Sequence, residues 1–137
     1  MHVLNLHIQT PAETFVHSNL KEAHLPGVDG IVGILPNHAS MIIGLRAGII
    51  HLSKKNKPTS HYFINSGVAY IQQNSCLILT ENSQPIGALD PSLLKETLEK
   101  YYDDLAGVDV TYEQRFIESQ IAITRAMLKA VGRNAAS

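Results

Sequence analysis

PGVDGIVGILPNHASMIIGLRAGII, the segment covering residues 26–50, carries the strongest structural signal in this chain. Gly27, Gly30 and Gly33 stand three apart in it, among β-branched residues. Only glycine reaches positive φ without steric cost, so this spacing predicts turns and close backbone approaches around a short strand.

A Pro-Asn pair interrupts the segment after its third glycine. Proline cannot donate a hydrogen bond to a central ladder, and asparagine tolerates left-handed backbone geometry. Pro36 and Asn37 therefore predict that the strand ends there. We expect residues 35–40 to form an ordered, exposed loop at one end of a sheet.

Short segments of alternating character lie on both sides of this region. In residues 3–8, Leu4, Leu6 and Ile8 share one face, which is the period of a half-buried strand. Turn signals then recur at close intervals, at Ser18-Asn19, residues 54–58, Ser66-Gly67 and residues 73–75. Many short strands at such spacing predict a β-sandwich or flattened barrel, which we place at residues 1–87.

Helical periodicity replaces the strand pattern near residue 90. Asp90 is a good N-cap and Pro91 suits a first helical turn, while Gly107 supplies a stop. Thr111 and Gln114 resemble a capping box that opens a second helix, which should run to about residue 131. Its expected apolar stripe contains Tyr112, Phe116, Ile123, Met127 and Ala130, and is widened by Ile117, Ile121 and Leu128.

The short connection at Gly107 predicts that the two helices are antiparallel neighbours. The expected fold class is therefore mainly β plus α. An N-terminal β-sandwich, or flattened barrel, would be followed at residues 88–137 by a C-terminal antiparallel two-helix hairpin.

Composition excludes several classes of function. A net charge of −1 over 137 residues offers no basic stripe for nucleic acid. No apolar run approaches the roughly 20 residues that span a bilayer, and because a strand pattern begins at Val3 we expect no targeting leader. The single cysteine, Cys76, rules out an internal disulfide and predicts a buried position in a reducing compartment.

Patterns for catalysis and for bound groups are also missing. The three glycines lack the lysine and helix of a phosphate loop, and no Gly-x-Ser-x-Gly elbow is present. We therefore expect neither catalysis nor a bound metal or cofactor. The histidines are scattered without zinc-ligand spacing: His2, His7, His17, His24, His38, His51 and His61.

The run PGxxGxxGILPNHA, followed by Leu45, Gly48 and Ile50 in the pattern LxxGxI, resembles the signature of the ε subunit of F-type ATP synthase, called δ in mitochondria. The similarity extends over residues 3–131. It implies a non-catalytic central-stalk subunit whose sandwich couples the γ subunit to the membrane rotor ring of c subunits. Such a chain would be peripheral to the membrane, on the cytoplasmic face of a bacterial plasma membrane.

The resemblance also implies a rotor-ring contact at the end of the sandwich. Some relatives carry an acidic residue where this chain has Ile31, so a charge pair made there would be lost. The other reading of His38 is a histidine that closes its loop by hydrogen bonding. The implied contact residues are Ile31, Pro36, Asn37, His38, Ala39 and Ser40.

A basic edge on the second helix has two compatible interpretations. Arg125, Lys129 and Arg133 stand four apart, which suits a solvated face that complements the helix dipole. The resemblance adds that this edge engages an acidic region of the β subunit, in the α/β catalytic head, when the hairpin extends. The extended hairpin would then inhibit ATP hydrolysis.

Many relatives bind ATP at the start of the first helix through a motif like [Ile/Leu]-Asp-x-x-Arg-Ala. Here Asp90 is retained, but Leu93 occupies the arginine position and removes the guanidinium. We expect weak or absent ATP binding.

Two other functions stay open beside the stalk subunit. One is a sandwich that binds or transforms a small molecule under a helical lid, and the other is an adenine-nucleotide sensor. A pocket lined by convergent polar groups would favour the small-molecule function. A filled core and an exposed apolar strip would favour the stalk subunit.

Overall fold

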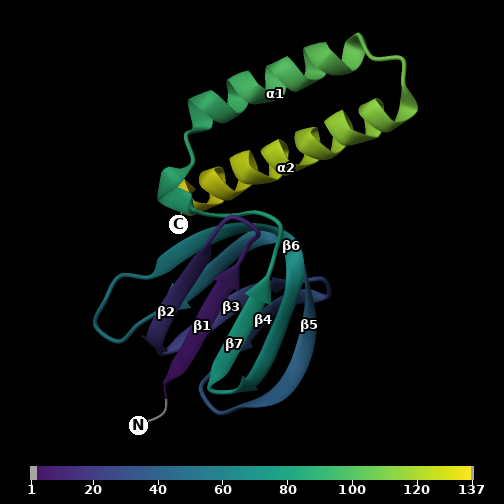
Figure 1. The fold of residues 1–137 in the computed structure, drawn as a ribbon. Helices are drawn as coiled ribbons and strands as arrows, with labels where there is room; N and C mark the ends of the chain where they lie inside the picture. Colours follow the sequence, from purple (N-terminus) through teal and green to yellow (C-terminus); the bar gives the residue numbers. More distant parts are fainter. Residues whose placement is uncertain (1–2, 137) are drawn as a thin grey trace. The chain divides into compact units, whose positions relative to one another are not determined.

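The computed structural model describes residues 3–136, and the chain divides into two compact units, Met1–Pro85 and Ile86–Ser137 (Figure 1). The first consists of strands and the second of helices. The expected class, mainly β followed by a two-helix hairpin, is confirmed.

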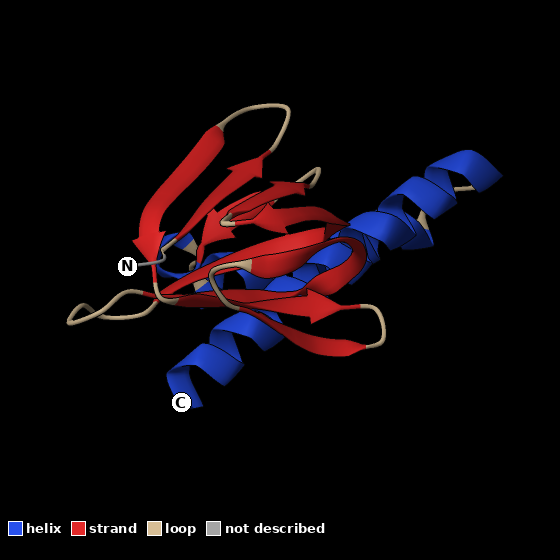
Figure 2. Cartoon of the chain, turned by 90° about the horizontal axis from the view of Figure 1, so that it is seen from below, coloured by secondary structure: helices blue, strands red, loops and turns tan. Residues whose placement is uncertain are grey.

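The strands of the first unit form one sheet that curls into two layers (Figure 2). Their order is β2-β1-β7-β6-β5-β3-β4, with β8 beside β6. The neighbours are antiparallel, except that β1 and β7 are parallel. The strands are β1 (Leu4–Gln9), β2 (Thr14–Leu20), β3 (Glu22–Gly27), β4 (Gly30–Ile34), β5 (His38–Ser53), β6 (Ser60–Gln73), β7 (Ser75–Leu79) and β8 (Ser83–Pro85).

Strands β5 and β6 form one long antiparallel hairpin that bends in its middle. Beyond the bend β6 pairs with β7, and before it β6 pairs with β8. The bend lies at Ser66 and Gly67, whose φ angles are 68° and 149°. The predicted turn at Ser66-Gly67 was wrong as a strand boundary, because β5 keeps its register on both sides, with Leu45 opposite Gly67 and Ala47 opposite Asn65.

Two other predicted boundaries were also wrong. Residues 35–37 lie between strands, but His38 already belongs to β5 and pairs with Gln73, so the expected loop is shorter than residues 35–40. The turn expected at Ser18-Asn19 lies inside β2, which continues to Leu20. At both places an asparagine adopts a left-handed backbone conformation, with φ of 59° at Asn19 and 62° at Asn37.

The core lies between the two layers and is filled by alternate side chains of the strands. Leu4, Leu6 and Ile8 are fully buried, as the alternation in β1 predicts. Cys76 is also buried, and burial raises the pKa of its thiol to about 12. The thiol therefore stays protonated and unreactive at neutral pH.

Three histidines on adjacent strands share one face of the sheet. His24 on β3 pairs with His51 on β5, which pairs with His61 on β6. The Nδ1 atoms of His51 and His61 are 2.8 Å apart, so one must donate and the other accept. Burial, and then the neighbouring His61 and His24, lower the pKa of His51 below its ordinary value of 6.5.

Acidification should therefore destabilise the sandwich. A histidine with a lowered pKa is protonated more readily in the unfolded chain, so its contribution is complete above pH 6.5 and is lost as the pH falls below that value. His17 acts in the same direction, mainly through burial. Urea unfolding from about pH 7.5 to about pH 5.5 should show falling stability. His51→Gln should flatten this profile, and an unchanged profile would contradict the assignment.

The second unit contains a short 3-10 turn and two helices, η1 (Ile86–Ala88), α1 (Pro91–Ala106) and α2 (Thr111–Ala136). The helices lie side by side and run in opposite directions (Figure 1). Asp90 is the N-cap of α1, as predicted, and its Oδ1 accepts hydrogen bonds from the backbone nitrogens of Ser92 at 2.9 Å and Leu93 at 3.4 Å.

Two details predicted for α2 were wrong. Tyr112 and Phe116 are 72% and 62% exposed, whereas Met127 and Ala130 of the same expected stripe are buried. Ile121, which was expected to widen that stripe, is buried as predicted, and Thr124 completes the buried face. The capping box does not form either. Thr111 is already helical, and Gln114 Nε2 donates to the Val108 carbonyl at 3.0 Å.

Removing the cap of α1 should weaken the helical unit. Asp90→Ala deletes the acceptor for two otherwise unpaired amides and should lower the free energy of unfolding by about 1 kcal/mol. Asp90→Asn keeps an acceptor oxygen and is the matched control. Chemical denaturation followed by far-ultraviolet circular dichroism would measure both variants, and equal stability of Asp90→Ala and wild type would contradict the capping role.

Candidate functional site

A row of cross-strand partners runs over the outer face of the sandwich. Ile42 on β5 pairs with Tyr70 on β6, and Tyr70 pairs with Leu77 on β7. Leu77 pairs with His7 on β1, which in turn pairs with Val16 on β2. Directly opposed residues project from the same face of a sheet, so these five side chains lie together.

Four members of this row are apolar or aromatic and face solvent. Ile42 is 69% exposed, Val16 56%, Tyr70 41% and Leu77 40%. Single exposed apolar residues are common, but neighbours such as Ile42, Tyr70 and Leu77, with Val16 beyond His7, mark an interaction surface. We call these four residues the apolar row.

A shallow groove continues the apolar row beyond Ile42. It has a volume of about 330 Å³ and lies between residues 27–32 and residues 41–44. Val28 and Ile31 line it and are 61% and 72% exposed. The Val28 amide donates to the Gly44 carbonyl at 3.0 Å and holds the β3–β4 turn against β5.

The contact residues implied by the resemblance do not form one cluster. Ile31 lines the groove beside the apolar row, while Pro36 lines a separate recess with Lys21 and Lys54. Ser40 and Ala39 are exposed on β5.

The asparagine and histidine of the same segment make local hydrogen bonds. The Asn37 amide donates to the side-chain oxygen of Asn74 on the neighbouring connection. His38 is half-buried, and its Nδ1 donates to the Ala39 carbonyl at 2.7 Å. This bond fits the reading in which His38 closes its loop, and it leaves the other ring nitrogen for a partner.

Comparison with known proteins identifies the architecture. A family model described as ATP synthase, Delta/Epsilon chain, beta-sandwich domain matches residues 3–86. The chain belongs to the ATP synthase delta/epsilon chain family. The match covers all the strands described above, including those that carry the apolar row.

Relatives in the delta/epsilon family extend the match into the helical unit. The ATP synthase epsilon chain of Campylobacter curvus is 32% identical over 133 residues, covering 97% of this chain and 94% of the relative. That of Rhodospirillum centenum is 28% identical over 133 residues, covering 93% and 91%. Both relatives are therefore similar over nearly their whole lengths.

Solved structures share the fold. A chain of the Euglena gracilis mitochondrial ATP synthase, from an OSCP/F1/c-ring assembly, aligns with a TM-score of 0.74 at 17% identity, over 98% of this chain and 81% of that one. A chain of the Tetrahymena thermophila central stalk and c-ring aligns with a TM-score of 0.60 at 14% identity, over 93% and 96%.

In the helical unit of this delta/epsilon chain, the basic residues predicted to contact the catalytic head are exposed to solvent. Arg125, Lys129 and Arg133 are exposed on α2, and none of them makes an ion pair with a described residue. Leu93 is 60% exposed, and the Asp90 carboxylate is engaged in capping α1.

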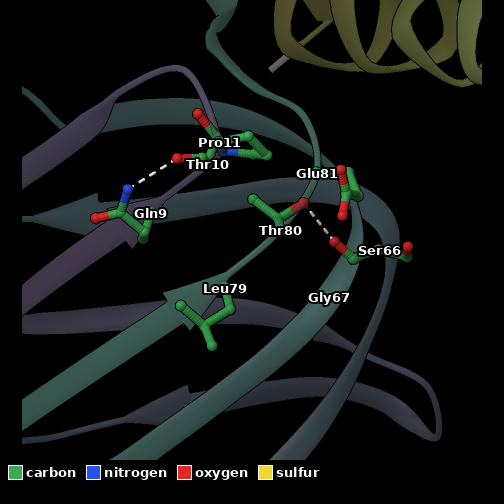
Figure 3. A pocket seen from close by; sticks show the side chains of 8 residues that line it. All are labelled: Gln9, Thr10, Pro11, Ser66, Gly67, Leu79, Thr80 and Glu81. Atoms are coloured by element: carbon green, nitrogen blue, oxygen red, sulfur yellow. Dashed lines mark hydrogen bonds between the residues drawn. The ribbon is translucent and has the colours of Figure 1, made fainter.

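A second recess of the sandwich has polar walls, shown in Figure 3, but its polar groups do not converge. It has a volume of about 500 Å³ and is lined by Gln9, Thr10, Pro11, Ser66, Gly67, Leu79, Thr80 and Glu81. Thr80 Oγ1 donates to the Ser66 carbonyl at 2.5 Å, and Gln9 Nε2 donates to the Thr10 carbonyl at 2.8 Å. These donors serve the protein's own backbone, so the recess does not favour the small-molecule function.

The part of the chain that the structure describes offers neither a metal site nor a membrane-spanning helix. No group of three or more His, Cys, Asp or Glu residues in that part is placed to hold a metal ion. No helix between residues 3 and 136 is both long enough and apolar enough to cross a membrane.

The apolar row was not predicted from the sequence, although a signal for it is present there. Strands β5, β6 and β7 carry apolar residues on both faces: Met41, Ile42 and Ile43 are consecutive, and so are Leu77, Ile78 and Leu79. A strand with one wet face should alternate instead. Ile78 enters the core and Ile43 packs against it, whereas Met41, Ile42, Leu77 and Leu79 remain exposed.

Proposed function

We propose that this chain is the ε-type subunit of an F-type ATP synthase central stalk, non-catalytic in itself, and that its sandwich couples the γ subunit to the membrane rotor ring of c subunits. The main support is the apolar row. An exposed apolar band over a filled core suits a lasting contact with a protein partner, because burying it removes apolar area from water. The γ subunit would lie on this band.

The rotor ring would meet the end of the sandwich that carries Pro36 and His38, and Ile31, which lines the separate groove beside the β3–β4 turn, would add to this contact. The pairing of His38 on β5 with Gln73 on β6 and the Asn37–Asn74 hydrogen bond hold this end in place. A rigid contact transmits torque without any chemistry in the chain itself. The chain would be held at the cytoplasmic face of a bacterial plasma membrane through the complex.

The helical unit would regulate the enzyme. Arg125, Lys129 and Arg133 form an exposed basic edge that lacks a partner among the described residues, which suits an acidic surface of the α/β catalytic head. With the hairpin extended into the head, this edge would inhibit ATP hydrolysis. No nucleotide or metal is needed for this role.

A pull-down from detergent-solubilised membranes tests the assignment. The affinity-tagged full-length chain should recover γ, α, β and the rotor ring in constant proportions. Recovery of the chain without these subunits would remove the stalk role, and turnover of a substrate by the purified chain alone would contradict the non-catalytic assignment.

A shortened chain tests regulation separately. In the assembled complex, a chain that ends at Asp90 should raise the rate of ATP hydrolysis, because the helical unit is gone. Replacing Arg125, Lys129 and Arg133 by glutamine should give part of this increase with the helices in place. Unchanged hydrolysis in both complexes would remove inhibition from the proposal.

A further inference from the structure

Charge is segregated along the strand axis of the sandwich. Of the five Lys and Arg residues between residues 1 and 85, four lie in the β2–β3 and β5–β6 connections: Lys21, Lys54, Lys55 and Lys57. We call the end formed by these connections the lysine end. The fifth, Arg46, is at the opposite end, where its Nε donates to the Gly27 carbonyl at 3.3 Å.

Acidic residues show the reverse distribution. Glu13, Asp29 and Glu81 lie in connections at the end opposite the lysine end. Glu22, the remaining acidic residue of the sandwich, is beside Lys21, and its Oε2 is 3.7 Å from His24 Nε2. The lysine end is therefore strongly positive although the whole chain carries a net charge of only −1.

The lysines surround a recess of about 520 Å³. Lys21, Lys54 and Lys55 line it together with the apolar side chains of Val3 and Leu20, and with Pro36. Lys54 is half-buried, and its charge is close enough to His17 on β2 to add to burial in lowering the pKa of that histidine. Leu20 is only 1% exposed, so the recess combines cationic groups with an apolar rim formed by the half-buried Val3 and Pro36.

The kind of cation indicates the kind of ligand. The planar guanidinium of arginine pairs with a carboxylate through two parallel hydrogen bonds. The ammonium of lysine is instead a compact point charge that binds phosphate without strict geometry. The lysine end carries lysine alone. Four such charges spread over two connections suit a surface with many separate phosphates better than one acidic peptide, and the apolar rim suits the region just below lipid headgroups.

We propose that the lysine end of the sandwich binds the phosphate headgroups of anionic phospholipids. This contact would be additional to the protein partners of the stalk. It would hold the sandwich near the membrane surface by electrostatic attraction, which weakens within a Debye length of the surface.

Vesicle flotation with the full-length chain tests this inference. The chain should float with vesicles of phosphatidylcholine mixed with phosphatidylglycerol but not with vesicles of phosphatidylcholine alone, and added salt should release it. The triple variant Lys21→Gln, Lys54→Gln, Lys55→Gln should bind at least about 10-fold more weakly. Its circular dichroism spectrum and melting curve should match wild type, since Lys21 and Lys55 are exposed and Lys54 is half-buried.

A charge-matched control comes from the helical unit. Lys95→Gln, Lys100→Gln, Arg115→Gln removes the same number of positive charges and should keep wild-type binding. Equal loss in both triple variants would overturn the inference, because net charge would then explain the binding. Equal binding of wild type to neutral vesicles would also overturn it by pointing to the apolar row.

Two further outcomes separate this inference from other roles. If the lysine variant bound vesicles normally but lost the rotor ring in phosphatidylcholine nanodiscs, the lysines would contact an acidic protein and the lipid inference would fail. The vesicle assay uses the chain alone. A failed recovery of stalk subunits would therefore leave its result unchanged, and the two proposals can fail separately.

Discussion

Gly67→Ala is expected to lower the free energy of unfolding of the sandwich by about 3 kcal/mol. Gly67 has a φ of 149°, which L side chains rarely adopt, and a Cβ there would be 2.3 Å from the Leu79 carbonyl oxygen. That oxygen belongs to the β7 backbone, so it cannot move aside like the tip of a side chain. Urea denaturation followed by circular dichroism would measure the loss.

Two other glycines separate the causes of this effect. Gly30 has a φ of 133°, and an added Cβ there would meet nothing within 4 Å, so Gly30→Ala carries backbone strain alone and should cost about 1 kcal/mol. Gly87 has open space and no positive φ, so Gly87→Ala should change stability by less than about 0.5 kcal/mol. If Gly67→Ala cost no more than Gly30→Ala, the close approach to Leu79 would contribute nothing.

Tyr70→Asp should weaken binding of the stalk partner by about 100-fold. Tyr70 lies between Ile42 and Leu77 in the apolar row, and an aromatic residue near the centre of an interface is where binding energy concentrates. A carboxylate at this position would be buried without a partner in the complex. Binding of the variant to purified γ subunit, measured by calorimetry, gives the change in affinity.

The matched control makes the same substitution on the other unit. Tyr112 is 72% exposed on α2, against 41% for Tyr70, so Tyr112→Asp should leave γ binding unchanged. The melting curves of both variants should stay close to wild type, because both side chains have solvent access. If Tyr70→Asp bound γ like wild type, the apolar row would not be the γ surface.

Local patterns predicted several elements because their causes are local. Alternation placed Leu4, Leu6 and Ile8 in the core, and the Asp-Pro pair at residues 90–91 marked the start of α1. Each prediction depends on a few neighbouring residues and on one backbone period. The family signature in residues 26–50 also rests on local turn chemistry, and the family match confirmed it.

Boundaries that depend on distant partners were predicted less well. His38 looked like a loop residue, but its pairing with Gln73 extends β5 through it. Ser66-Gly67 looked like a turn between two strands, but continuous pairing with β5 makes it a bend within β6. Tyr112 and Phe116 fitted the helical period of a buried stripe, yet both are exposed, and the buried face of α2 is formed by Ile121, Thr124, Met127 and Ala130.

Residue order alone therefore established the strand periods, the cap of α1, the two-part organisation and the family. Tertiary structure alone showed that Val16, Tyr70, Leu77 and Ile42 share one exposed face, and that Lys21 and Lys54 meet at one recess. The physical reason is that strand register and sheet closure bring together residues that are tens of positions apart in the sequence. When both faces of a strand are apolar, the sequence pattern does not show which face stays exposed to water.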